Sequence, residues 1–290
     1  MSTPTESSEE VATHTAVTGT PGTASILRTI IRRELLTAVG RRTYLALWFG
    51  FVGVLLGIAW FGGGMHAGYV STIIDLLTPL ELLIPVIGFM LGYRAILDDR
   101  RRGVLDVLGT YPVSAWQIVT GVYLGRAIGL AAVVSTALSV LVYPIMLTDS
   151  QQYLFYATHT GGDSIGHFLR FIVLTVVFAL VMLAVAIAIS ALIGTTRTAI
   201  AALGLTLFGL LFAADIGLVF ALSRGVIAEE SLVSSLAISP LSAYRGLVIE
   251  TTIVATAGTG PRTASPLASV LGLLVWWLGS LLVAAGAIRR

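Results

Sequence analysis

The chain of 290 residues contains no cysteine and no lysine, and only 11% of its residues are charged. Without cysteine, the protein can form no disulfide, no thiolate metal site and no cysteine nucleophile. Without lysine, it lacks the phosphate-binding residue of a P-loop and the amine of a Schiff-base enzyme. If ATP drives this protein, another subunit must therefore bind the nucleotide.

Long apolar stretches are what the sequence has instead. Hydrophobic residues make up 56% of the chain and the mean hydropathy is +0.94, whereas soluble domains carry about 25% charged residues. A membrane helix needs about 20 apolar residues, and charge is absent from Thr43–Ile74, Ala127–Thr148, Phe171–Thr196 and Thr263–Ile288. The sequence therefore predicts a multi-pass protein of the plasma membrane, surrounded by lipid.

We expect an all-α polytopic fold with six spans. The predicted spans are Tyr44–Phe61, Leu80–Leu97, Ile118–Leu147, Phe168–Ile193, Thr198–Leu222 and Leu267–Ile288. The long connection 223–266 contains apolar residues that suggest short helices lying along the outer surface.

The arginines predict the orientation of these spans. Thirteen of the 17 basic residues, all arginine, fall on one side of the predicted topology, and four fall on the other. Because basic residues accumulate in cytoplasmic loops, both termini are expected in the cytoplasm. The basic residues flank the spans and the net charge is only +2, so the pI of about 9.1 does not indicate a nucleic-acid partner.

The N-terminal part divides into a tail and a helix. Residues 1–25 are rich in Ser and Thr without apolar periodicity and predict a disordered cytoplasmic tail. A transmembrane domain is expected to follow at 26–290. It opens with apolar residues at helical spacing and arginines between them up to Arg42, which is typical of an amphipathic helix in the membrane interface; a solvated basic lead-in is the alternative.

The cytoplasmic connection between the second and third spans is the strongest candidate site. An acidic pair and an arginine triplet precede a short turn with one apolar face. That face is expected to be buried against a partner protein. The alternative is an ordinary basic loop that folds onto the membrane surface. The candidate residues are Asp98, Asp99, Arg102, Gly103, Val104, Leu105, Leu108 and Pro112.

Two charged residues stand within or beside predicted spans. Asp215 in the fifth span is a candidate for a substrate or proton role, or for a hydrogen bond within the bundle, because a carboxylate inside a membrane is costly. Arg126 in the third span is its counterpart on the inner side, or an arginine at the lipid headgroups.

Glycines at four-residue spacing predict close helix packing in the third span, within the bundle or across a dimer. They are Gly121, Gly125 and Gly129. The histidines and methionines are scattered and no cysteine accompanies them, so we expect no metal site and no cofactor in this chain.

The stretch Gly92–Gly125 resembles the central signature of ABC exporter permeases of the second type. More narrowly, Thr110–Pro112, Ala59–Gly64, Asp215 and Ser239–Leu247 resemble the NosY-type permeases, which accompany a NosF-type ATPase and a NosD-type outer protein in the maturation of nitrous oxide reductase, a copper enzyme. The resemblance covers residues 26–288; the triplet Arg100–Arg102 departs from it, since a more acidic stretch is expected there.

This resemblance implies a permease subunit that catalyses nothing itself. Its partners would be an ABC ATPase that binds ATP and magnesium, a second copy of the chain, and an outer accessory protein. The loop from Asp98 would be the coupling helix that docks into the ATPase. The alternatives are an ATP-independent secondary transporter using Asp215 and Arg126, and a membrane scaffold that transports nothing.

Overall fold

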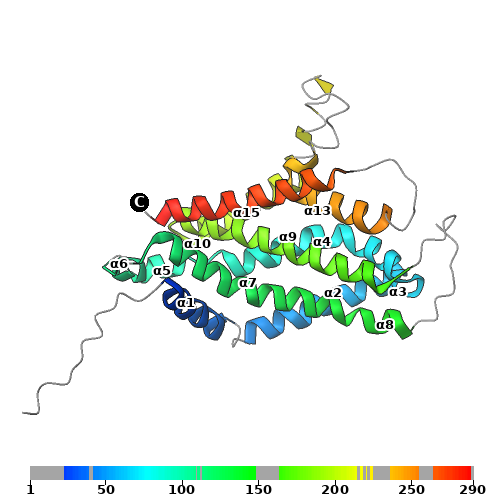
Figure 1. The fold of residues 1–290 in the computed structure, drawn as a ribbon, viewed down its shortest axis with the longest axis horizontal. Helices are drawn as coiled ribbons and strands as arrows, with labels where there is room; N and C mark the ends of the chain where they lie inside the picture. Colours follow the sequence, from blue (N-terminus) through cyan, green and yellow to red (C-terminus); the bar gives the residue numbers. More distant parts are fainter. Residues whose placement is uncertain are drawn as a thin grey trace, which may run out of the picture.

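The computed structural model describes residues 23–38, 42–108, 110–111, 113–147, 163–213, 236–254 and 264–288, and isolated positions between 216 and 224. These residues contain helices and no strand (Figure 1). The helices are α1 (Thr23–Ala38), α2 (Arg42–Gly62), α3 (Gly64–Ala67), α4 (Tyr69–Gly92), α5 (Leu97–Arg101), α6 (Val104–Leu108), α7 (Ala115–Val140), α8 (Val142–Leu147), α9 (Ile165–Leu192), α10 (Thr196–Phe208), η1 (Gly209–Ala213), η3 (Leu236–Ile238), α13 (Pro240–Val248), η4 (Ile249–Val254) and α15 (Pro266–Ile288).

Five of the described helical segments are long and apolar enough to cross a bilayer. They are Tyr44–Gly62, Tyr69–Arg101, Ala115–Leu147, Ile165–Leu192 and Pro266–Ile288. The fifth predicted span appears as a shorter apolar helix, Thr196–Phe212, and its continuation falls largely on residues outside the described ones. The predicted tail also lies outside them, except that its last three residues belong to α1.

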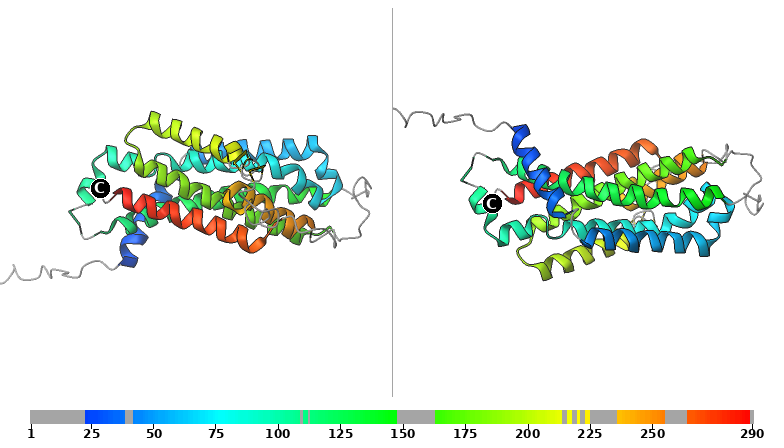
Figure 2. Two further views of the ribbon diagram at one scale, coloured as in Figure 1. Left: turned by 90° about the horizontal axis from the view of Figure 1, so that it is seen from above. Right: turned by 90° about the horizontal axis from the view of Figure 1, so that it is seen from below.

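Helix α9 is the centre of the bundle, because it packs against α4, α7 and α15. Its aromatic side chains Phe168, Phe171 and Phe178 are fully buried. Figure 2 shows α10 at one edge of the bundle and α15 at the opposite edge. Helices α1, α5 and α6 and the end of α15 gather at one end of the molecule, and α3 and α8 lie at the other (Figure 1).

The second span differs from the sequence-based prediction. Helix α4 begins at Tyr69, not at Leu80, and it contains Pro79 and Pro85. Two carboxylates within α4 have partners elsewhere: Asp75 accepts a hydrogen bond of 2.8 Å from the backbone N of Gly64, and Glu81 pairs with Arg245. Residues typical of a helix end are therefore accommodated inside a helix by tertiary contacts.

Local capping explains two other boundaries. Ser114 forms a capping box at the start of α7: its Oγ accepts from Gln117 N at 3.3 Å, and Gln117 Oε1 accepts from Ser114 N at 2.9 Å. Asp163 caps α4 from a distance, since its oxygens accept from Tyr69 N at 2.8 Å and Val70 N at 3.0 Å. That cap ties the segment before α9 to the start of α4.

The segment between the last two spans also differs from expectation. Helix α13 does not lie along a surface but packs against α15, α9 and α4. Its Tyr244 is fully buried, stacks on Phe178 with ring centroids 4.5 Å apart, and shares a 2.9 Å hydrogen bond with Thr175. The apolar residues of this segment therefore join the core of the bundle.

Candidate functional site

The predicted cytoplasmic loop folds as two short helices, α5 and α6, which we call the elbow (Leu97–Leu108). Gly103 joins them with φ of 69°, a left-handed conformation that glycine adopts without strain. Pro112 and the side chain of Leu108 lie outside the described residues.

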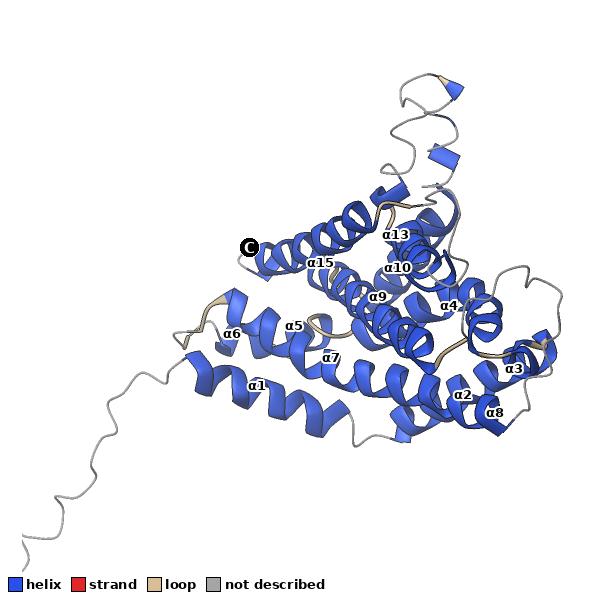
Figure 3. Ribbon diagram, turned by 45° about the vertical axis from the view of Figure 1, so that its right-hand side comes forward, coloured by secondary structure: helices blue, strands red, loops and turns tan. Residues whose placement is uncertain are grey.

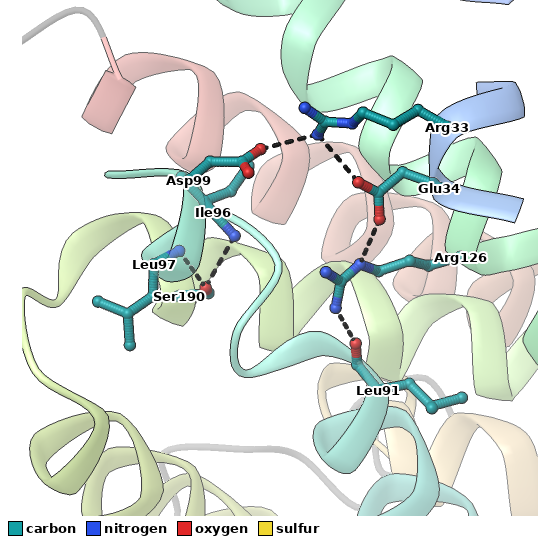
Figure 4. Close-up of polar contacts among 8 residues, drawn as sticks. All are labelled: Arg33, Glu34, Leu91, Ile96, Leu97, Asp99, Arg126 and Ser190. Carbon is teal, nitrogen blue, oxygen red and sulfur yellow. Dashed lines mark hydrogen bonds and ion pairs between the residues drawn. The ribbon is translucent and has the colours of Figure 1, made fainter. Parts of the chain in front are cut away.

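The start of the elbow is fixed to the central helix of the bundle. Ser190 of α9 is fully buried, and its Oγ accepts hydrogen bonds of 3.1 Å from the backbone N of Ile96 and of Leu97 (Figure 4). Because the first N–H groups of a helix have no partner within the helix, this hydroxyl acts as a cap supplied from another span.

Two arginines of the elbow reach two further spans. Arg100 Nη2 donates to the carbonyl oxygen of Ala287 in α15 at 3.3 Å, and Arg101 Nη1 donates to Thr196 Oγ1 at the start of α10 at 2.8 Å. Two members of the arginine triplet, Arg100 and Arg101, thus hold the elbow against the start of α10 and the end of α15. Arg102, the third member, is exposed.

A chain of ion pairs connects the elbow with α1, α7 and α4 (Figure 4). Asp99 Oδ2 lies 2.9 Å from Arg33 Nη2, the same Nη2 lies 3.0 Å from Glu34 Oε1, and Glu34 Oε2 lies 3.2 Å from Arg126 Nε. Arg126 also donates to the carbonyl oxygen of Leu91, near the end of α4. We call these contacts the elbow network.

Arg33 interacts in the network with two carboxylates, those of Asp99 and Glu34. Burial acts to lower the pKa of Arg33, but its hydrogen bonds and charge interactions with Asp99 and Glu34 raise that pKa above its usual value. Glu34 is only 6% exposed and lies between two guanidinium groups. Its two carboxylate oxygens each contact one of these guanidinium groups.

Helix α1 reaches this position because α7 has glycines where the two helices meet. A Cβ at Gly121 would come within 2.7 Å of Ile30, and a Cβ at Gly125 would overlap Glu34. Gly129 is buried one turn further along α7. Two of the three predicted packing glycines therefore admit α1 of the same chain (Figure 3).

The elbow network surrounds a polar cavity of about 460 Å³. Its lining includes side chains from α1, α2, α4, the elbow and α7, among them Asp98, Arg102 and Val104. Asp98 there pairs with Arg94 at 3.0 Å. The cavity places charged groups between α1 and the elbow.

The exposed face of the elbow differs from the predicted one. Leu105 packs against the core of the bundle and Val104 is half-buried, whereas Val107 and Tyr111 are each 61% exposed. Val107 of the elbow and Tyr111, three residues after its end, thus provide exposed apolar surface within the described chain.

Of the two charged residues that the sequence suggested within or beside spans, Asp215 and Arg126, the structure describes only Arg126. Asp215 lies outside the described residues. Arg126 is 18% exposed and has its carboxylate partner in Glu34, a residue that the sequence reasoning passed over. An acidic side chain one turn after Ile30, on the apolar face of an amphipathic helix, was the available signal.

Known proteins match the chain along nearly its whole length. The family described as "ABC-2 family transporter protein" matches residues 5–288. The chain belongs to this family. It is 29% identical over 279 residues to the probable ABC transporter permease protein NosY of Pseudomonas aeruginosa, with 91% of this chain and 98% of the relative covered. It is 30% identical over 281 residues to the probable NosY permease of Stutzerimonas stutzeri, with 90% and 97% covered.

The protein is thus the membrane-spanning permease subunit of an ABC transporter, a multi-pass protein of the plasma membrane. Its family implies an ATPase subunit as partner. The elbow connects two long spans, α4 and α7, through two short helices. It lies at the end of the bundle where α1 and the C-terminal turn of α15 are also found (Figure 1).

Proposed function

We propose that the elbow is the docking site of a separate ATPase, and that two permeases and two ATPases form the exporter. One observation carries this proposal: the elbow has direct polar contacts to α1, α9, α10 and α15. A displacement of the elbow would therefore be transmitted to most of the bundle. ATP and magnesium would be bound and ATP hydrolysed in the partner, while the permease provides the pathway.

The proposed transmission has two branches. Closure of the ATPases would move Arg100 and Arg101 with the ends of α15 and α10. It would also pull Asp99, which is connected through Arg33 and Glu34 to α7. Because partly exposed ion pairs contribute little to stability, the elbow network can change its geometry without breaking the packing of α9.

Docking is tested by substituting Val107 in the elbow and Tyr111 just after it. Val107→Asp together with Tyr111→Asp places carboxylates where an apolar cleft of the ATPase would bury the side chains, and we expect at least a tenfold loss of ATPase co-purifying from membranes. The matched control is Leu147→Asp, which changes a residue that is 67% exposed on α8, at the opposite end of the bundle. Undiminished co-purification at a normal permease level would contradict the docking proposal.

We further propose six crossings with both termini in the cytoplasm, the fifth of them formed by α10 and its continuation. One support is the uneven arginine distribution. The other is that the elbow and the C-terminal end of α15 lie at the same end of the bundle (Figure 1). Cysteines introduced singly at Ser114 or Thr195 should be shielded from an impermeant thiol reagent in intact cells. Cysteines at Gly63 or Ser164 should react; labelling at Ser114 from outside would reverse the topology.

The second copy is proposed to pack beside α2. No atom lies within 4 Å of a Cβ built at Gly53 or Gly57. Because small residues at this spacing let two helices approach closely, this face of α2 can accept a helix of a second copy. Gly57→Cys should cross-link two permeases in native membranes, whereas Val173→Cys on α9, 61% exposed, should not. Equal cross-linking at both positions would indicate random collision.

The cargo is proposed to serve the maturation of nitrous oxide reductase, with an outer accessory protein as a further partner. The support is the similarity to two NosY permeases over at least 90% of the chain. Deletion of the gene should leave nitrous oxide reductase without its complete copper centre, and the wild-type gene should restore it. A fully active reductase in the deletion strain would refute this assignment while leaving the transporter function untouched.

A further inference from the structure

Helix α1 has a second face, which takes no part in the elbow network. Ile30 and Glu34 are the residues of α1 that meet the glycines of α7. Arg28 and Arg32 each stand two residues earlier, about 200° further round the helix, and both are exposed. Figure 3 shows α1 on the outside of the bundle beside α7. The two arginines therefore lie on the side of α1 that is turned away from α7.

The charges of Arg28 and Arg32 are not compensated within the described chain. Arg33 and Arg126 at this end of the bundle pair with carboxylates, but none of the ion pairs among the described residues includes Arg28 or Arg32. Glu34 is the only acidic residue of α1, and its two oxygens contact Arg33 and Arg126. The outer face of α1 thus presents two positive charges one turn apart.

Apolar side chains flank these two charges on the same face. A shallow hollow in the surface of α1 is lined by Ala24, Leu27, Arg28, Ile31, Arg32 and Leu35. Three of these residues form an apolar row at four-residue spacing, and each is half-buried. Leu36, which follows the row, is 69% exposed. Arginines beside an apolar row are typical of a helix at the boundary between lipid headgroups and acyl chains.

We propose that this hollow binds an anionic phospholipid of the surrounding bilayer. Side chains four residues apart on a helix have Cβ atoms about 5–6 Å apart, so the guanidinium groups of Arg28 and Arg32 can reach one phosphate, which suits their planar donors. The acyl chains would cover the apolar row. A zwitterionic headgroup brings its own positive charge and would leave the arginines uncompensated, which is why an anionic lipid fits better.

The lipid is favoured as the occupant because it supplies both a phosphate and an apolar chain. The bound lipid would hold α1 in place, and the opposite face of α1 carries the elbow network. This inference goes beyond the proposed exporter function, since it concerns a site for a membrane component and not for the ATPase or the cargo.

The native chain has no cysteine, so a single reporter can be placed beside the hollow. Leu36→Cys, one turn after Arg32, is labelled with an uncharged environment-sensitive fluorophore. The full-length permease in phosphatidylcholine nanodiscs then receives increasing fractions of brominated phosphatidylglycerol or brominated phosphatidylcholine, which quench the fluorophore on contact. We expect half-maximal quenching at a fraction of phosphatidylglycerol roughly 5- to 25-fold lower, because each arginine near an anionic lipid contributes a factor of about five. Equal fractions for the two lipids would overturn the proposal.

The variant Arg28→Gln with Arg32→Gln should bring this ratio close to one. Its matched control is Arg42→Gln with Arg197→Gln, which removes two positive charges from exposed positions at the starts of α2 and α10 and should keep the ratio within about twofold of wild type. An equal loss in both variants would indicate attraction to the whole surface and would refute the site. Arg28→Lys with Arg32→Lys retains the charges and should keep a preference; a ratio of one would also refute it.

Two further measurements separate the lipid from other anions. Inorganic phosphate, compared with chloride at equal ionic strength, should leave the ratio unchanged; a fall to one would assign the hollow to free phosphate. The variant Glu6→Gln, Glu9→Gln and Glu10→Gln should behave as wild type. A preference that appears only in this variant would identify the N-terminal segment as the occupant and overturn the lipid site. No measurement uses the ATPase, so failure here is distinguishable from failure of the docking proposal.

Discussion

The elbow network and the Glu81–Arg245 pair solve the same problem, holding charges in a membrane protein, in opposite ways. In the network, several ion pairs share a cavity at one end of the bundle, and Arg33 and Asp99 remain 41% and 17% exposed. In the deep pair, one carboxylate that is 3% exposed depends on one arginine. Charges near water can exchange partners, whereas a buried charge without its partner is destabilising.

The largest effect is expected from Arg245→Leu. The substitution leaves Glu81 buried without its counter-ion, and removing one partner of a buried ion pair costs about 3–5 kcal/mol. The free energy of unfolding of the detergent-solubilised permease measures this loss. The double variant Glu81→Gln with Arg245→Gln should recover most of it. A loss below about 1 kcal/mol for Arg245→Leu would mean that the pair contributes no more than a surface contact.

A smaller loss is expected from Glu34→Ala in the elbow network. The carboxylate is enclosed by Arg33 and Arg126, and hydrogen bonds to charged groups contribute about 1.5–3 kcal/mol. The variant should also uncouple ATP hydrolysis from transport, since it interrupts the contact between α1 and α7. Glu34→Gln retains one acceptor, so its free energy of unfolding should fall between those of Glu34→Ala and wild type. An identical free energy of unfolding for all three proteins would show that the network does not stabilise the fold.

Gly125→Ala tests the groove in which α1 lies. The new Cβ would overlap Glu34, and overpacking costs about 1–3 kcal/mol. About 1 kcal/mol of this is offset by the higher helix propensity of alanine, so a net loss near 1 kcal/mol is expected. Gly279→Ala in α15 has no atom within 4 Å of its Cβ and should be neutral or stabilising. Equal stability of the two variants would show that α1 can move aside freely.

The smallest effect is expected from Arg33→Gln. Its pair with Asp99 is partly exposed, and such pairs contribute about 0.2–1 kcal/mol. The loss should shrink as ionic strength rises from 0.05 M to 0.5 M, because salt screens exposed charges, whereas the loss caused by Arg245→Leu should stay constant. A salt-independent effect of Arg33→Gln would show that this arginine acts through packing.

The composition and the long apolar runs predicted the class of fold and the position of most spans. Apolar runs of sufficient length identify membrane helices without any tertiary information, because lipid rather than protein is their surroundings. The prediction was wrong where local chemistry suggested an end: Pro79 and Glu81 are typical of helix termini, yet α4 runs through both. The α13 segment, predicted for the surface, is likewise packed in the bundle.

The sequence by itself determined that the protein spans the membrane and that the elbow lies between two spans. Only the tertiary structure decided which side chains meet there. Arg33 and Glu34 are separated from Asp99 and Arg126 by more than 60 residues, and Arg245 reaches Glu81 across 164. Helical periodicity fixes the face on which a residue lies, but the partner on that face depends on how the helices pack, and this is why the charged contacts could not be predicted.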